Sequence, residues 1–371
     1  MTRINFTPVE LPLDAYRGEA MWTLEREKLF SRTWVHVAAG HELPAPGDCR
    51  PVELAGLPLL LVRQRSGDIA AFHNVCRHRG TRLVREACNA KAVLTCPYHG
   101  WAYGLDGALR TTPYWDPGDG TGPEGFDKRD FGLRQVRSAV WCDQIFLCLD
   151  NGAPDFATHI APLARRWAHA DLSLLRFGGA LAYEIDVNWK LVIENFLDTY
   201  HLPFTHQQLG PVETARNFVD IDEAGRVIGI NYVSGAADKN KGDSGFRTFP
   251  GFDADQMTSQ DIAMMYPNTL FEFVPEHVMF FRVDPVSPTR TRELLSFYYL
   301  GDDATEPKLA EGRRMALEAW DRINHQDFPI LDDLQAAMHS PAARGLPQPA
   351  PGWEFAQARF RRRVAEDLGL A

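Results

Sequence analysis

The stretch CRHRGTRLVREACNAKAVLTCPYHGW, residues 76–101, decides the fold. It opens with Cys76-x-His78 and closes with Cys96-x-x-His99, and 17 residues separate the two pairs. Cysteine and histidine at such short spacings are typical of metal sites. The stretch therefore predicts two loops that meet at a metal centre.

Two kinds of metal centre use this set of ligands, and the order of the ligands separates them. In the usual zinc finger one loop supplies both cysteines and the other supplies both histidines. In a Rieske [2Fe–2S] centre one iron carries two cysteines and the other carries two histidines. Here each loop supplies one cysteine and one histidine. This order favours the iron–sulfur centre, and structural zinc is the alternative.

The segment CRHRG…CPYHGW resembles the cluster motif of Rieske proteins. The resemblance implies that Cys76 and Cys96 bind one iron and that His78 and His99 bind the other. A Rieske cluster carries one electron and makes no product by itself, so the residues after 150 need an explanation of their own.

The bulk composition narrows the class of protein. With 371 residues, 45% of them hydrophobic, the chain is long enough for two cores. A net charge of −10 argues against a nucleic-acid or anionic-membrane partner. The N-terminal residues lack a signal pattern, and the longest apolar run, LPLLLV at 57–62, is too short to cross a bilayer. We therefore expect a cytoplasmic protein whose other cysteines are ordinary thiols.

A second constellation lies in NWKLVIENFLDTYHLPFTH, residues 188–206. His201 and His206 would lie about 140° apart on a regular helix. Pro203 disfavours the helical state just before it, so a break there would bring the two histidines together. Two histidines and one carboxylate form the facial triad of non-haem Fe(II) oxygenases, which leaves positions open for O2.

This segment resembles the mononuclear-iron motif of Rieske non-haem iron oxygenases. The matching residues are Asn188, Trp189, Lys190, Glu194, Asn195, Asp198, Tyr200, His201 and His206. The resemblance covers the whole chain in the expected order, with the cluster domain before the iron domain. The chain is thus similar to the terminal oxygenase (α) component of that family.

The resemblance also implies a third iron ligand, a carboxylate some eight residues before a glutamine. Asp327 precedes Gln335 by eight residues and is the first choice. Asp332 and Asp333 are the alternatives, although a solvated helix face explains these two residues better. Asp327 could instead cap a helix that begins directly after it.

The family's electron path implies partners. A separate reductase, possibly with a ferredoxin, would take electrons from NAD(P)H and reduce the cluster. Asp198 would be the electron bridge between His201 and the partner subunit's His99 in a homotrimer. The one dinucleotide-like motif, Gly120-x-Gly122-x-x-Gly125, has no strand before it and no helix after it, so we expect no nucleotide site here.

The distribution of helical and β-rich segments predicts an α+β protein. We expect an N-terminal helical arm at 1–36 that packs on the catalytic domain, and a Rieske β domain at 37–150 with short strands and Gly, Pro and Asp turns. We expect a catalytic domain at 151–371. By resemblance, it is helix-grip-like with an antiparallel sheet. Its C-terminal helical tail should break at Asp327-Phe328-Pro329.

The substrate is the least defined prediction. An aromatic-rich pocket favours hydroxylation or dihydroxylation of an arene; it would also suit monooxygenation or demethylation of a betaine- or choline-like amine through cation–π contacts. A remote alternative is an electron-transfer Rieske protein without oxygenase activity. The candidate pocket residues, each of which could equally be β-sheet core, are Phe196, Phe204, Met265, Tyr266, Phe271 and Phe273.

Overall fold

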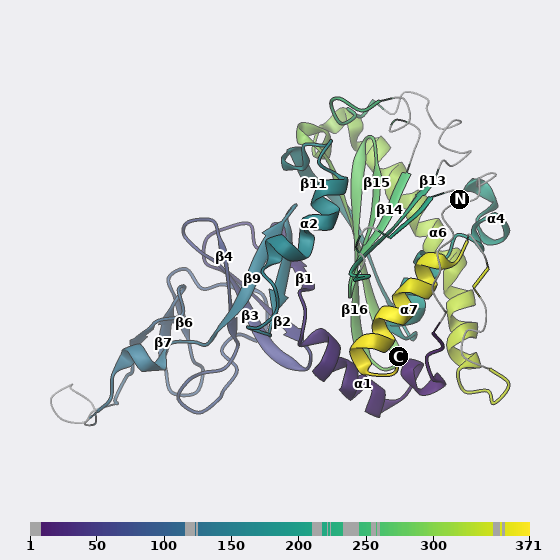
Figure 1. Cartoon of the computed structure of the whole chain (residues 1–371). Helices are drawn as coiled ribbons and strands as arrows, with labels where there is room; N and C mark the ends of the chain where they lie inside the picture. The colour runs from purple at the N-terminus through teal and green to yellow at the C-terminus, as the bar shows by residue number, and fades with distance from the viewer. Residues whose placement is uncertain are drawn as a thin grey trace. The chain divides into compact units, whose positions relative to one another are not determined.

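The structure is a computed structural model that describes residues 9–115, 123, 125–209, 217–220, 222, 224–232, 245–253, 257, 260–343, 349–350 and 353–371. The chain forms two compact units, Phe30–Ala153 and Met1–Leu29 with Pro154–Ala371 (Figure 1). Trp34 belongs to the first unit. There the guanidinium carbon of Arg137 lies 5.0 Å from the centroid of its ring.

The first unit is an antiparallel β structure with two sheets. The larger sheet has the order β1 (Val35–Ala39), β10 (Gln144–Cys148), β9 (Gln135–Trp141), β4 (Ile69–His73), β3 (Leu57–Arg63), β2 (Asp48–Leu54) and β5 (Cys88–Asn89). The smaller sheet has the order β6 (Val93–Thr95), β7 (Ala102–Gly104) and β8 (Leu109–Thr111). A core that includes Tyr103 of β7 and Trp101, which directly precedes that strand, also contains Leu60 and Val62 of β3.

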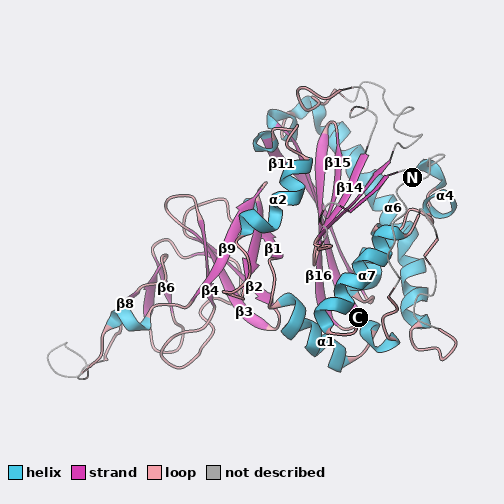
Figure 2. Ribbon diagram, viewed as in Figure 1, coloured by secondary structure: helices cyan, strands magenta, loops and turns pink. Residues whose placement is uncertain are grey.

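The second unit is built on one antiparallel sheet. Its order is β11 (Leu175–Ile185), β17 (Arg290–Leu300), β16 (His277–Ser287), β15 (Thr269–Val274), β14 (Gln260–Met265), β13 (Val227–Tyr232) and β12 (Asn217–Asp220). Its helices are α1 (Glu19–Glu25), α2 (Phe156–Arg166), α3 (Trp189–Phe196), α4 (Leu202–Thr205), α6 (Ala310–Ala337) and α7 (Phe355–Leu368). Figure 2 shows these strands gathered in one sheet with the helices around it. The α+β class is therefore confirmed.

Each strand of this sheet presents alternate residues to opposite faces, as the pleat requires. On one face of β15, Phe271 and Phe273 pack against Trp167, with ring centroids 5.3 and 5.0 Å from it. Glu272, between them in sequence, points to the other face, toward Trp320 of α6. The two faces consequently have different chemistry.

Helix α6 corrects one expectation. It runs without interruption from Ala310 to Ala337, with Pro329 in its interior. A proline there removes one backbone hydrogen bond and usually costs about 3 kcal/mol, but α6 packs on both α3 and β11, and these contacts hold it in place. The predicted break at Asp327-Phe328-Pro329 is wrong, and Asp327 is not a helix cap.

The N-terminal segment is joined to the catalytic unit by buried polar contacts. Tyr16 donates a hydrogen bond of 2.8 Å to Glu194 Oε1, and Arg361 Nε lies 3.2 Å from Glu194 Oε2. Lys190 Nζ lies 2.5 Å from Glu25 Oε1. These contacts connect the N-terminal segment and α7 to helix α3. In the described part of the chain, no helix has the length and apolarity needed to cross a membrane.

Candidate active site

The two predicted cluster loops have the same turn. The backbone N–H of Gly80 donates to the Cys76 carbonyl at 2.9 Å, and the N–H of Gly100 donates to the Cys96 carbonyl at 3.1 Å. Both glycines have positive φ, 79° and 68°, which residues with a side chain rarely adopt. The sequence therefore fixes two matching tight loops, each of which begins with its cysteine.

These loops bury the two thiols, leave His78 half-buried and expose His99. Cys76 and Cys96 are buried, whereas His99 is exposed. The rings of His78 and His99 lie together, with their centroids 4.7 Å apart. Burial raises the pKa of the Cys96 thiol, while backbone hydrogen bonds from Tyr98 and His99 lower it.

This donor set fits a two-iron cluster better than a single ion. Tyr103 Oη lies 3.3 Å from Cys76 Sγ, and burial raises the pKa of Tyr103. Backbone and hydroxyl groups around the thiols are suitable partners for cluster sulfur. Among the described residues, the four loop side chains do not form a group of donor atoms within 4.8 Å of one another. One tetrahedral zinc ion would require such a group.

The second constellation forms around the end of α3. Asn188 caps this helix by accepting a hydrogen bond from Lys190 N, and the helix ends at Phe196. A new short helix, α4, starts after His201 with Pro203 in its first turn. This break folds the chain so that the Nε2 atoms of His201 and His206 lie 3.2 Å apart.

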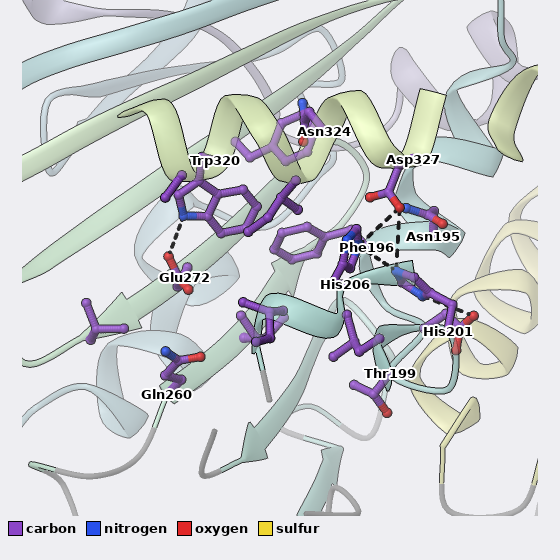
Figure 3. A pocket seen from close by; sticks show the side chains of 18 of the residues that line it. Asn195, Phe196, Thr199, His201, His206, Gln260, Glu272, Trp320, Asn324 and Asp327 are labelled. Carbon is purple, nitrogen blue, oxygen red and sulfur yellow. Dashed lines mark hydrogen bonds and ion pairs between the residues drawn. The ribbon is translucent and has the colours of Figure 1, made fainter. Parts of the chain in front are cut away.

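Asp327 of α6 completes this group (Figure 3). Its Oδ1 lies 3.1 Å from His206 Nε2 and 3.7 Å from His201 Nε2. That oxygen is buried and has no hydrogen-bond partner. In the described part of the chain, this is the group of three donor atoms close enough to hold one metal ion. Two imidazoles and one carboxylate fit non-haem iron. Asp332 and Asp333 are exposed on α6 and lie outside the group.

The far ring nitrogens of the two histidines differ in their contacts, because His206 Nδ1 is hydrogen-bonded whereas His201 Nδ1 has no hydrogen-bond partner among the described residues. Gln326 Oε1 lies 2.8 Å from His206 Nδ1, and Asp198 Oδ2 lies 3.4 Å from His201 Nδ1. Gln335 accepts a 2.7 Å hydrogen bond from Asn188 N and so joins α6 to the start of α3. Hydrogen bonds to the far ring nitrogen usually fix the orientation of metal-binding histidines.

A cavity of about 350 Å³ lies beside His201, His206 and Asp327. It is bounded by α3, α6 and one face of the sheet. Phe196 and Trp320 are among its aromatic residues, and Figure 3 shows Phe196 between the histidines and Trp320. Burial, with the charge of Asp327 next in importance, raises the pKa of Glu293 in this wall to about 8.

Five of the six predicted pocket residues do not line this cavity. Phe204 is 69% exposed. Phe271 and Phe273 lie on the opposite face of the sheet, and Met265 and Tyr266 are buried outside the cavity wall. For the predicted residues on strands the face was wrong, because neighbouring residues of a strand point to opposite faces of the sheet. Phe196 is the one predicted residue that lines the cavity.

Sequence reasoning missed the contribution of α6 to the cavity. Trp320, Ile323 and Asn324 lie on the same helical face as Asp327. They precede Asp327 by seven, four and three residues, a spacing that was visible in the sequence and that places residues on one helical face. Two nearby cations do not line the cavity: Lys190 pairs with Glu25, and Arg282 Nε lies 2.9 Å from Asp284.

The fold and these two constellations define a Rieske non-haem iron oxygenase. The chain belongs to the family of ring-hydroxylating alpha subunits, whose catalytic-domain model matches residues 172–369. The model of the Rieske [2Fe-2S] domain matches residues 33–133. The protein is therefore the terminal component of an oxygenase. A [2Fe–2S] cluster, a mononuclear iron and a separate reductase are characteristic of this family.

Named relatives fall into two groups. The glycine betaine monooxygenase oxygenase subunit of Pseudomonas aeruginosa is 25% identical over 100% of this chain and 92% of its own length. Spinach (Spinacia oleracea) choline monooxygenase is 26% identical over 90% of this chain and 72% of its own. The alpha subunit of biphenyl dioxygenase from Paraburkholderia xenovorans is 33% identical over 56% of this chain and 47% of its own.

A solved quaternary ammonium Rieske monooxygenase shares the fold. Its TM-score is 0.78 at 21% identity, and the match covers 96% of this chain and 95% of the other. A naphthalene 1,2-dioxygenase structure matches with a TM-score of 0.75 at 20% identity, over 99% of this chain and 94% of the other. The chain therefore shares its fold with solved structures of both an amine and an arene oxygenase.

Proposed function

We propose that this terminal oxygenase holds a [2Fe–2S] cluster through Cys76, Cys96, His78 and His99. A mononuclear iron would be held through His201, His206 and Asp327. The observation that carries the proposal is the convergence of these last three residues, which come from two distant segments, beside a cavity whose lining includes aromatic side chains. When bound, the two groups supply electron transfer and O2 activation.

The protein's own residues have separate tasks in this proposal. His201, His206 and Asp327 supply three donor atoms on one side and leave the other side open to the cavity. Gln326 holds the His206 ring through Nδ1. Asp198 lies beside His201 and is the proposed electron bridge. The aromatic wall keeps water from the reacting substrate.

We infer that the substrate is a methylated or quaternary amine rather than an arene. The support is the extent of the matches. The glycine betaine monooxygenase of Pseudomonas aeruginosa, spinach choline monooxygenase and a carnitine monooxygenase match 100%, 90% and 89% of this chain, whereas biphenyl dioxygenase matches 56% of it. A second glycine betaine monooxygenase, from Chromohalobacter salexigens, matches 54%. We also propose a homotrimer, reduced by a separate reductase with or without a ferredoxin, in the cytoplasm. Six cysteines without a disulfide suit a reducing compartment.

Substitution of the proposed iron ligands tests the function. The wild type should contain about three iron atoms per chain, two in the cluster and one mononuclear. His201→Ala and Asp327→Ala should each reduce this to about two, keep the visible spectrum of the cluster, and abolish substrate-dependent O2 consumption. Asp198→Asn should keep all the iron and lose most turnover.

Asp332→Ala is the matched control, because it removes an exposed carboxylate from the same helix. It should keep about three iron atoms per chain and full turnover. A wild type with about two iron atoms, or an Asp327→Ala variant that keeps the third, would contradict the proposed site.

A further inference from the structure

We propose that Glu272, together with Trp320 and Phe196, forms a subsite that binds the ammonium group of a substrate that carries no carboxylate. This inference rests on the proposed function, because the subsite lies in the cavity beside His201, His206 and Asp327. It adds a specificity-determining residue that the ligand motifs do not contain. It also selects one kind of amine among several.

Glu272 is a carboxylate placed in the cavity wall by the sheet. It lies on central strand β15 and is 8% exposed. Trp320 Nε1 donates a hydrogen bond of 3.0 Å to its Oε2, as Figure 3 shows. His277 Nε2 lies 3.8 Å from the same oxygen. The indole donor is neutral, so it orients the carboxylate without cancelling its charge.

The position of Glu272 separates it from the proposed metal site. In Figure 3, Glu272 and Trp320 lie at one side of the cavity and Asp327, His201 and His206 lie at the other, with Phe196 between them. A substrate whose cationic group lies against Glu272 would thus extend past Phe196 toward the three metal-binding side chains. The arrangement would fix the orientation of the bound substrate.

Aromatic surface strengthens this subsite. The rings of Phe196 and Trp320 are nearly parallel, at 23°, with centroids 6.5 Å apart, and Phe281 packs edge-on against Phe196 at 5.8 Å. Aromatic faces attract cations, and most strongly when water is excluded. A methylated ammonium group gains both from these faces and from the nearby carboxylate.

Acidic side chains of the described cavity lining disfavour a carboxylate-bearing substrate. The acidic residues in the described lining are Asp198, Glu272, Glu276, Glu293 and Asp327. The same described lining contains no lysine or arginine. At this end of the cavity a substrate carboxylate would meet the carboxylate of Glu272, and no lysine or arginine of the described lining could pair with it, which is unfavourable. A choline-like cation fits this wall better than a betaine- or carnitine-like zwitterion.

Binding measurements with matched ligands test the subsite without turnover. Isothermal titration calorimetry on the anaerobic, iron-loaded protein would compare choline, its neutral isostere 3,3-dimethyl-1-butanol, glycine betaine and indole. Choline should bind at least about tenfold more tightly than each of the others, because it alone is a cation without a carboxylate. Equal or tighter binding of the neutral isostere, glycine betaine or indole would overturn the proposal.

Glu272→Gln then assigns the preference to one residue. The amide still accepts the indole hydrogen bond, so the variant removes the charge and keeps the shape. It should lose the preference for choline over the isostere. Glu318→Gln, which removes an exposed charge from α6 outside the cavity, should retain it. A preference that survives in Glu272→Gln would reject this residue.

Iron content and the cluster spectrum distinguish this inference from the proposed function. If the wild type holds about three iron atoms but does not prefer choline, only the cation subsite fails. If the mononuclear iron is absent, the proposed function fails first. The comparison of ligands on the wild type decides the inference even if Glu272→Gln does not fold.

Discussion

His159 on helix α2 is a buried histidine with no catalytic task. It is 3% exposed, and its Nε2 has no hydrogen-bond partner. Burial lowers its pKa to about 4, and the charge of Arg226 acts in the same direction, while Asp222 opposes it. The folded protein therefore holds this side chain neutral at pH values where the unfolded chain protonates it.

This pKa predicts a loss of stability in mild acid. Between the unfolded pKa of about 6.5 and the folded value, the unfolded chain binds one more proton, so stability falls as the pH falls. Between pH 7 and pH 5 this one group should cost about 2 kcal/mol. His159→Gln should lose about that much less stability than the wild type over this interval in urea unfolding.

The exposed His169→Gln is the control and should follow the wild type at both pH values. If His159→Gln and the wild type have the same pH dependence, His159 does not have a lowered pKa in the folded protein.

At the scale of elements, α3 depends on an ion pair with the N-terminal segment. Lys190 on α3 is 0% exposed, Glu25 at the end of α1 is 1% exposed, and burial lowers the pKa of Lys190. Trp189 also donates a 2.9 Å hydrogen bond to Glu25. Since the chain after α3 carries Asp198, His201 and His206, this contact positions the proposed iron site.

Breaking one half of the pair should be costly. Lys190→Met leaves Glu25 charged and buried, which should lower the free energy of unfolding by about 3–5 kcal/mol. The double variant Glu25→Gln with Lys190→Met should be less destabilised than the single one, because neither charge remains. Chemical unfolding of the single and double variants measures the coupling.

Lys308→Met, at an exposed site, is the control and should change stability little. If the double variant loses as much free energy of unfolding as Lys190→Met and Glu25→Gln lose together, the two side chains act independently.

Other elements show where sequence patterns were sufficient. The glycines after each Cys–His pair dictated the cluster loops, and Pro203 dictated the break between His201 and His206, because both effects are local to the backbone. Pro329 did not break α6, since packing against α3 and β11 outweighs a local preference. Local rules therefore failed where a helix had strong tertiary contacts.

At the scale of the whole molecule, we expect electrons to pass between subunits. The proposal predicts that two inactive variants complement each other. Cys96→Ser should lack the cluster, His201→Ala should lack the mononuclear iron, and neither alone should turn over substrate. Co-expression should restore about a quarter of wild-type activity if chains mix randomly around a closed ring.

Activity of the purified mixed assembly, with iron analysis, provides the measurement. Mixing the two variants after each has assembled is the control and should restore little. No recovery in mixed assemblies of the expected mass would show that both sites of one chain act together.

The sequence by itself determined the α+β class and the family, and it predicted the cluster ligands and the histidine pair with its downstream carboxylate. These depend on spacing, turn chemistry and motif order, all of which are written along the chain. Tertiary structure decided the rest. It brings Asp327, and not Asp332 or Asp333, beside His201 and His206. It also places Glu272 and Trp320 in the cavity wall and buries Phe271 and Phe273 on the opposite face of the sheet. The physical reason is that the face of a strand or helix depends on what packs against it, and that packing joins residues far apart in sequence.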